Sequence, residues 1–185
     1  MKQHIITFIA IILFGLTRMP VTVRAADSVS DPDGQIAGGI SVTADQRANI
    51  LKAYFHAFKS PLENDADTFV QEADANNLDW KLVAAISGVE STFGENIPAG
   101  SYNAWGWGIP TGAQDGVHFT SWKDGISQVS QGLKKNYFDH GAQNIYDVGW
   151  IYAANGDSWG SHVQFFMDKI GAFTPADPQF LNVNL

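Results

Sequence analysis

Residues 79–94 decide the fold, and they read Asp-Trp-Lys-Leu-Val-Ala-Ala-Ile-Ser-Gly-Val-Glu-Ser-Thr-Phe-Gly. Asp79 is a residue type that favours the N-cap of a helix. The apolar residues after it recur at spacings of four, three and four, which is the period of an α-helix: Leu82, Ile86, Val89 and Phe93. We therefore expect a helix here, with Glu90 close to its end.

The helical period recurs on both sides of this segment. Capping boxes at Thr43-x-x-Gln46 and Ser121-x-x-Asp124 predict two helix starts. Strand-like alternation is scarce, so the sequence predicts an all-α fold, or nearly so. The other predicted helices cover residues 43–58, 61–77, 121–137, 145–152 and 158–170. Gly141 is placed to end the segment that follows 121–137. The last helix has one apolar face, formed by Trp159, Val163, Phe166 and Ile170.

One long segment, residues 94–119, lacks any helical period. It contains six glycines, one tyrosine and two tryptophans. Loops of this length inside a compact helical domain are usually functional or disordered, and the aromatic content argues against disorder. We expect a Gly/Trp-rich active-site loop.

The beginning of the chain is typical of a secreted protein. Lys2 precedes an apolar run of 12 residues, and Val23 and Ala25 fit the small-x-small rule for cleavage. The alternative, an uncleaved anchor, would need a run of about 20 residues. We expect a signal peptide at 1–25, a flexible linker at 26–42, a helical domain at 43–172 and a tail at 173–185. The predicted location is the periplasm or cell envelope, without stable membrane insertion after cleavage.

The composition narrows the possible partners. The chain has 11 Lys+Arg against 19 Asp+Glu, a net charge of −8, which argues against nucleic acid as a partner. It has no cysteine, and its five histidines are not paired at the spacing of metal ligands. We expect no metal, no cofactor and a monomeric chain.

Glu90 is the candidate catalytic residue. It follows an almost wholly apolar segment at the end of the predicted helix, where poor solvation and the helix C-terminus both favour a protonated carboxyl. Such a carboxyl can act as a general acid. The loop that follows carries Tyr102, Trp105 and Trp107 for stacking on sugar rings, and Asn103 as a hydrogen-bonding group. The alternatives are a surface glutamate for Glu90 and a core role for one of the tryptophans.

The segments 79–94 and 102–109 resemble bacterial lysozyme-like domains, those grouped with endo-β-N-acetylglucosaminidase-like domains and soluble lytic transglycosylases. Residues 119–137 and the later Tyr152, Trp159 and Val163 are also similar to these domains. The resemblance covers residues 61–170. It implies a lysozyme-like glycosidase domain at 43–172, with Glu90 as catalytic acid. The implied substrate-binding residues are Ser91, Tyr102, Asn103, Trp105, Trp107 and Tyr152.

The reaction outcome stays open at this point. Soluble lytic transglycosylases carry a Gly-Leu-Met-Gln-like turn where this chain has Gly-Trp-Gly-Ile at 106–109. A hydrolase would need a second carboxylate; Asp115 in the loop is the best candidate among Glu95, Asp115, Asp124 and Asp157. The expected function is cleavage of β-1,4 bonds in peptidoglycan or a related N-acetylglucosamine-containing glycan. The alternative is a non-catalytic glycan-binding module with the same fold.

Overall fold

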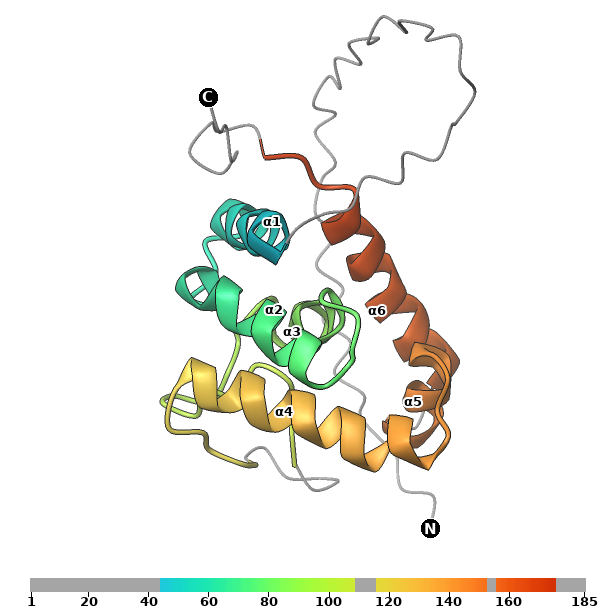
Figure 1. Ribbon diagram of the computed structural model, residues 1–185. Helices are drawn as coiled ribbons and strands as arrows, with labels where there is room; N and C mark the ends of the chain where they lie inside the picture. Colours follow the sequence, from blue (N-terminus) through green and yellow to red (C-terminus); the bar gives the residue numbers. More distant parts are fainter. Residues whose placement is uncertain (1–43, 109–115, 153–155, 176–185) are drawn as a thin grey trace, which may run out of the picture. The chain divides into compact units, whose positions relative to one another are not determined.

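The described part of the chain is helical, as the sequence predicts (Figure 1). The computed structural model describes residues 44–108, 116–152 and 156–175, apart from the side chains of residues 44, 45, 151, 152, 156 and 157. No strand occurs among these residues. The elements, with two short 3₁₀ helices marked η, are α1 (Ala44–Ala57), η1 (Glu63–Asp65), α2 (Ala66–Ala75), α3 (Leu82–Ser91), α4 (Trp122–Asn136), η2 (Phe138–His140), α5 (Ile145–Tyr152) and α6 (Gly156–Gly171).

Helix α3 is enclosed by the other helices. Eight of its ten residues are buried, and it packs against α6, α2 and α4 (Figure 1). A helix that is apolar on nearly all sides gains stability only where neighbours cover those sides. Around it, α1 packs on α2, α2 on α4, and α5 on α6. The apolar stretch that decides the fold is thus the central helix of the described residues.

The turn after α3 is anchored in an aromatic cluster. Phe93 is fully buried. Its ring contacts those of Tyr54 and Phe55 from α1 and Phe166 from α6, at centroid distances of 5.5, 5.9 and 5.2 Å. Phe58, predicted on the apolar face of α1, is 41% exposed. Its ring still packs on those of Phe93 and Tyr54, at centroid distances of 4.8 and 5.0 Å, and its amide donates to the Tyr54 carbonyl at 3.3 Å. Phe58 therefore lies on the apolar side of α1, one residue beyond its end at Ala57.

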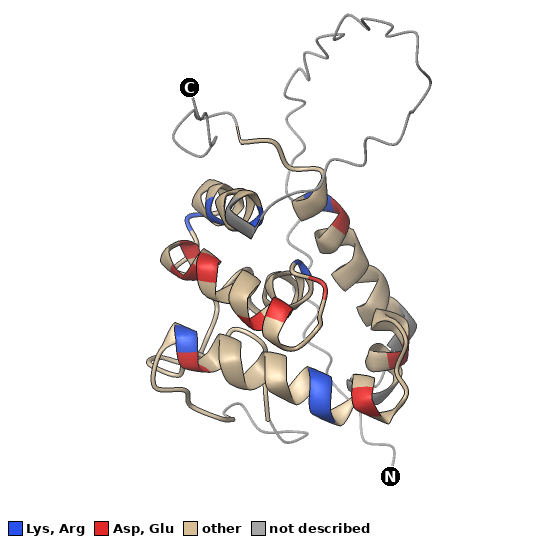
Figure 2. Ribbon diagram, in the orientation of Figure 1, with Lys and Arg blue, Asp and Glu red and all other residues tan. Residues whose placement is uncertain are grey.

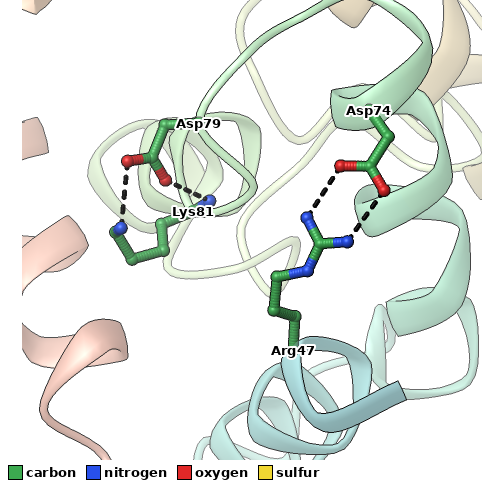
Figure 3. Close-up of polar contacts among 4 residues, drawn as sticks. All are labelled: Arg47, Asp74, Asp79 and Lys81. Carbon is green, nitrogen blue, oxygen red and sulfur yellow. Dashed lines mark hydrogen bonds and ion pairs between the residues drawn. The ribbon is translucent and has the colours of Figure 1, made fainter. Parts of the chain in front are cut away.

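Two helix starts show which capping signals hold. The Ser121 side chain accepts a hydrogen bond from the Asp124 amide at 3.1 Å, so the predicted cap of α4 is confirmed. Asp79 is not the N-cap of α3, which is Lys81. Instead its two carboxylate oxygens accept from the backbone N–H and the Nζ of Lys81, both at 2.9 Å (Figure 3). Asp79 therefore closes a turn just before the helix.

The remaining bounds differ in detail from the predicted ones. The segment after Pro61 starts as the 3₁₀ helix η1 before α2 begins, a common form of helix entry. Helix α2 ends at Ala75 with Asn76 as its C-cap, close to the predicted end at residue 77. The predicted helix 145–152 is confirmed, whereas α6 begins two residues earlier than Ser158. The segments 1–25 and 26–42, the capping residue Thr43 and the tail from 176 lie outside the described residues.

Charged residues on the described helices are spread over several elements (Figure 2). Arg47 of α1 binds both carboxylate oxygens of Asp74 of α2, at 2.7 and 2.8 Å (Figure 3). The guanidinium lowers the pKa of Asp74.

Within the described part of the chain, no helix is long and apolar enough to cross a membrane.

Candidate functional site

Glu90 lies at the next-to-last position of α3, where the buried helix reaches the surface. The residue as a whole is exposed, although the seven positions from Leu82 to Gly88 are buried. Its Oε1 accepts a hydrogen bond of 2.6 Å from Nε1 of Trp159, which α6 supplies. The carboxyl group is therefore reachable from solvent and, at the same time, held by a side chain 69 positions later in the chain.

The surroundings of Glu90 favour its protonated form. Removal of water by the neighbouring protein atoms raises the pKa of the carboxyl, and the hydrogen bond from Trp159 opposes this by stabilising the charged form. The net direction is upward from the ordinary value of 4.5. Among the described residues, no basic side chain forms an ion pair with Glu90. A carboxyl in this state can hold a proton at a pH where most glutamates have lost theirs.

The backbone immediately after Glu90 turns sharply. Thr92, Phe93 and Gly94 all have positive φ angles, of 55°, 58° and 86°. Residues with a Cβ adopt this conformation only at a cost, so the burial of Phe93 helps to fix the turn. Such backbone outliers often lie at functional sites.

Ser91 holds the end of α3 to the loop that follows. Its hydroxyl donates to the Ala104 carbonyl at 2.8 Å and accepts from the Gly94 amide at 2.8 Å. The residue is only 4% exposed. The expectation that Ser91 contacts a ligand is therefore wrong for this structure, because its hydroxyl is buried and engaged. Its role is to fix Glu90 relative to the loop.

Asn103 organises that loop. Its side-chain nitrogen donates to the carbonyls of Trp107 and Val117, each at 2.9 Å, and its oxygen accepts from the Trp107 amide at 2.9 Å. The residue is 5% exposed. The prediction of a sugar-binding amide is thus corrected: both ends of the side chain bind the protein's own backbone.

Trp105 belongs to the core, which corrects its assignment as a substrate-binding residue. It is fully buried, and its indole nitrogen donates to the Val83 carbonyl at 2.9 Å. The ring lies against Gly125 of α4, where an added Cβ would be 2.7 Å from it. A side chain without accessible surface cannot stack on a sugar.

Tyr102 and Trp107 reach the surface. Tyr102 is 37% exposed and meets Trp122 edge to face. Trp107 is half-buried, and its ring occupies the space over Gly132 of α4, where an added Cβ would lie 2.3 Å from it. The structure thus leaves these two as the aromatic residues of the loop that a ligand could touch.

Gly106 brings the loop next to Glu90. It has a φ of +61°, and a Cβ built on it would lie 3.4 Å from Oε2 of Glu90. Glycine suits this position because it adopts a positive φ readily and because it places no side chain against the Glu90 carboxyl. The glycine-rich loop and the carboxyl, predicted separately from the sequence, therefore meet in the structure.

Of the remaining predicted site residues, the structure describes only some. Asp115 lies outside the described residues, as do the side chains of Tyr152 and Asp157. Asp124 is engaged: its carboxylate accepts from the backbone and hydroxyl of Thr120 and from Gln128, and these bonds lower its pKa. Glu95 is exposed. Among the described carboxylates, none other than Glu90 has both an indole partner and an adjoining glycine.

A separate cavity of about 290 Å³ lies at the amino end of α3. Eight residues of helix separate Leu82, which lines it, from Glu90, or roughly 12 Å along the axis. The predicted site residues that the structure describes do not line it. The lining includes Asn77, Asp79, Leu82, Gln143, Tyr146 and Gln164.

Two features of the site had no local signal in the sequence. Trp159 fits the apolar face of the last helix, and nothing in its neighbourhood predicts its bond to Glu90. Gly125 and Gly132, seven positions apart on α4, make room for Trp105 and Trp107, a requirement visible only once α4 meets the loop. No protein-family model matches this chain, and comparison with curated proteins gives no match.

Proposed function

We propose that this chain is a glycosidase that cleaves β-1,4 bonds of peptidoglycan, or of a related N-acetylglucosamine-containing glycan, in a lysozyme-like domain. Glu90 is the general acid. The predicted signal peptide would carry the enzyme to a substrate of the cell envelope. The observation that carries the proposal is the state of Glu90: an accessible carboxyl with a raised pKa, beside a glycine-rich aromatic loop.

The arrangement suits proton donation to a poor leaving group. Protonated Glu90 gives its hydrogen to the glycosidic oxygen, and the bond from the sugar C1 to that oxygen breaks with its electron pair moving to the oxygen. The cation left at C1 takes either water or the sugar's own C6 hydroxyl. Glu90, now a carboxylate, accepts the proton that this nucleophile releases. The two nucleophiles distinguish a hydrolase from a lytic transglycosylase.

Loop aromatics supply the sugar contacts in this proposal. Tyr102 and Trp107 flank Gly106 in sequence and retain accessible surface. The chain has a net charge of −8, so long-range electrostatic attraction to an envelope rich in anionic polymers is not expected. Aromatic faces bind sugar rings without requiring charge. The proposed contacts are therefore short-range.

The test is turnover of purified peptidoglycan by the wild type and by Glu90→Gln, with products analysed by mass spectrometry. The variant keeps the size of the side chain and its acceptor for Trp159 but cannot act as an acid. Activity should fall by about 10²–10⁴-fold, with glycan binding retained. Anhydro sugar ends would identify a transglycosylase, and reducing ends a hydrolase.

Glu72→Gln is the matched control, because it makes the same exchange in α2, where the carboxylate accepts from Asn76 and, among the described residues, has no bond to Glu90 or Trp159. A folded Glu90→Gln protein with near-normal turnover would refute the acid assignment. Binding by the wild type without any product would identify a glycan-binding module instead.

A further inference from the structure

We propose that Trp159 is a positioning residue: its indole N–H holds Oε1 of Glu90, so that Oε2, the oxygen next to Gly106, carries the proton that the acid delivers. This inference rests on the proposed function of Glu90. It adds which oxygen reacts, on which side the glycosidic bond lies, and which residue sets that geometry.

The chemistry of the indole group determines the assignment. Tryptophan Nε1 is a donor and never an acceptor, so the oxygen 2.6 Å away must accept. In a protonated carboxyl, the carbonyl oxygen is the stronger acceptor and the other oxygen bears the hydrogen. The bond from Trp159 therefore stabilises the form of Glu90 in which Oε1 is the carbonyl and Oε2 is the hydroxyl.

The direction of Oε2 agrees with this role. Oε2 is the Glu90 atom nearest the position that a Cβ on Gly106 would occupy, at 3.4 Å. Apart from the neighbours of Gly106 in the chain, no atom outside Glu90 among the described residues lies within 4 Å of that position, so it can admit a substrate oxygen. The proton on Oε2 then passes to the glycosidic oxygen from the side of residues 102–108.

The donor itself is well fixed. Trp159 is only 8% exposed and belongs to the hydrophobic core, on a helix that packs directly against α3. A buried indole between two packed helices loses little freedom on forming this bond. Its effect is to restrict the rotation of a carboxyl that lies where the buried helix reaches the surface.

Other charged groups do not compete for Glu90 among the described residues. No ion pair or hydrogen bond joins it to the charged side chains of the helices that contact α3. These are Asp67, Glu72 and Asp74 on α2, Lys123, Asp124, Lys134 and Lys135 on α4, and His162, Asp168 and Lys169 on α6.

The direct test is a pH titration of the tryptophan indole ¹H–¹⁵N signals by NMR, without substrate. The Trp159 signal, identified by its loss in Trp159→Phe, should shift with pH about a midpoint above 4.5, the ordinary value for glutamate. The shift should vanish in Glu90→Gln. Trp105 is an internal control, because its indole donates to the Val83 carbonyl, which does not titrate.

A second measurement tests the role in catalysis. Trp159→Phe keeps an aromatic ring in the core and removes the N–H, so kcat should fall about 10–100-fold with little change in KM. The alkaline limb of the pH–rate profile should move to higher pH, because the bond that lowers the pKa of Glu90 is gone. A residue with a purely structural role would not move that limb.

The outcomes separate the inference from the proposed function. A Trp159 signal that ignores pH, or that shifts equally in Glu90→Gln, overturns the inference even if glycan is cleaved. So does a folded Trp159→Phe enzyme with unchanged kcat and pH limb. Absence of cleavage by the wild type would overturn the proposed function, whereas the NMR titration would still decide whether Trp159 holds Glu90.

Discussion

Gly106 approaches Glu90 so closely that a Cβ on it would lie 3.4 Å from the Oε2 oxygen. That distance is an ordinary van der Waals contact, so a methyl group at this position would lie directly against Oε2. Gly106 also has a φ of +61°, a backbone conformation that glycine adopts without strain.

We predict that Gly106→Ala lowers turnover by more than its effect on stability explains. Alanine at positive φ costs roughly 1–2 kcal/mol, and its methyl group restricts access to Oε2. The matched control is Gly100→Ala, at a φ of +71° with no atom within 4 Å of the added Cβ. Thermal unfolding and glycan turnover of both variants would be compared.

The two variants should lose similar stability, but only Gly106→Ala should lose activity in the folded state. Equal activities would mean that the open space beside Oε2 is not used. This outcome would also weaken the assignment of the reacting oxygen to the side of Gly106.

The raised pKa of Glu90 predicts that this residue lowers the stability of the folded protein by an amount that grows with pH. Folding favours the protonated form, so ionisation destabilises the native state as pH rises from the ordinary value of 4.5 through the raised one. Glu90→Gln should therefore match the wild type near pH 4 and become relatively more stable towards pH 7. Thermal unfolding as a function of pH measures this.

Glu95→Gln controls for the loss of one negative charge, because Glu95 is exposed just beyond α3. The gain from Glu90→Gln at pH 7 should exceed the gain from Glu95→Gln. Equal gains would attribute the effect to net charge rather than to desolvation of Glu90.

Local patterns in the sequence predicted the helices well because neighbouring residues determine them. The bounds of α5 and the Ser121 cap follow from periodicity and short-range hydrogen bonding. The predicted N-cap at Asp79 is wrong because aspartate can satisfy either a helix start or the turn before it, and here it accepts a hydrogen bond from the Lys81 amide. The choice depends on where the chain enters the core.

The candidate site was predictable only in part, since its contacts join distant segments. The apolar run before Glu90 indicated a desolvated carboxyl, in agreement with the raised pKa. Nothing local indicated that Trp159 would donate to it across 69 positions. The aromatic spacing of the loop leaves open whether Trp105 or Trp107 is buried. In the structure, Trp105 packs on Gly125 and is fully buried, whereas Trp107 packs on Gly132 and is half-buried.

The hydrogen bonds of Ser91, which connect the end of α3 to the loop, should contribute to stability. Ser91→Ala would leave the Gly94 amide and the Ala104 carbonyl without their bonds of 2.8 Å, at a cost of about 1–3 kcal/mol for buried groups. Ser130→Ala is the matched control: it is fully buried, and its hydroxyl has no partner among the described residues. Denaturant unfolding should show the loss for Ser91 and little change for Ser130. A comparable loss at both positions would show that the Ser91 bonds add nothing specific.

The two kinds of loop aromatic should behave in opposite ways. Trp105→Ala removes a fully buried ring and its bond to Val83, and should destabilise the fold by about 3–5 kcal/mol. Tyr102→Ala removes a ring that is 37% exposed, and should reduce glycan affinity by about 1–3 kcal/mol, as for other aromatic stacking surfaces, with little effect on stability. Tyr146→Ala, at a 40% exposed tyrosine of α5 that packs on Gly160, controls for the loss of an exposed ring outside the loop. Calorimetric binding to purified glycan fragments, alongside thermal unfolding, measures both quantities. If Tyr102→Ala and Tyr146→Ala bind glycan equally well, Tyr102 is no part of the sugar-binding surface, and Trp107 becomes the aromatic residue to test.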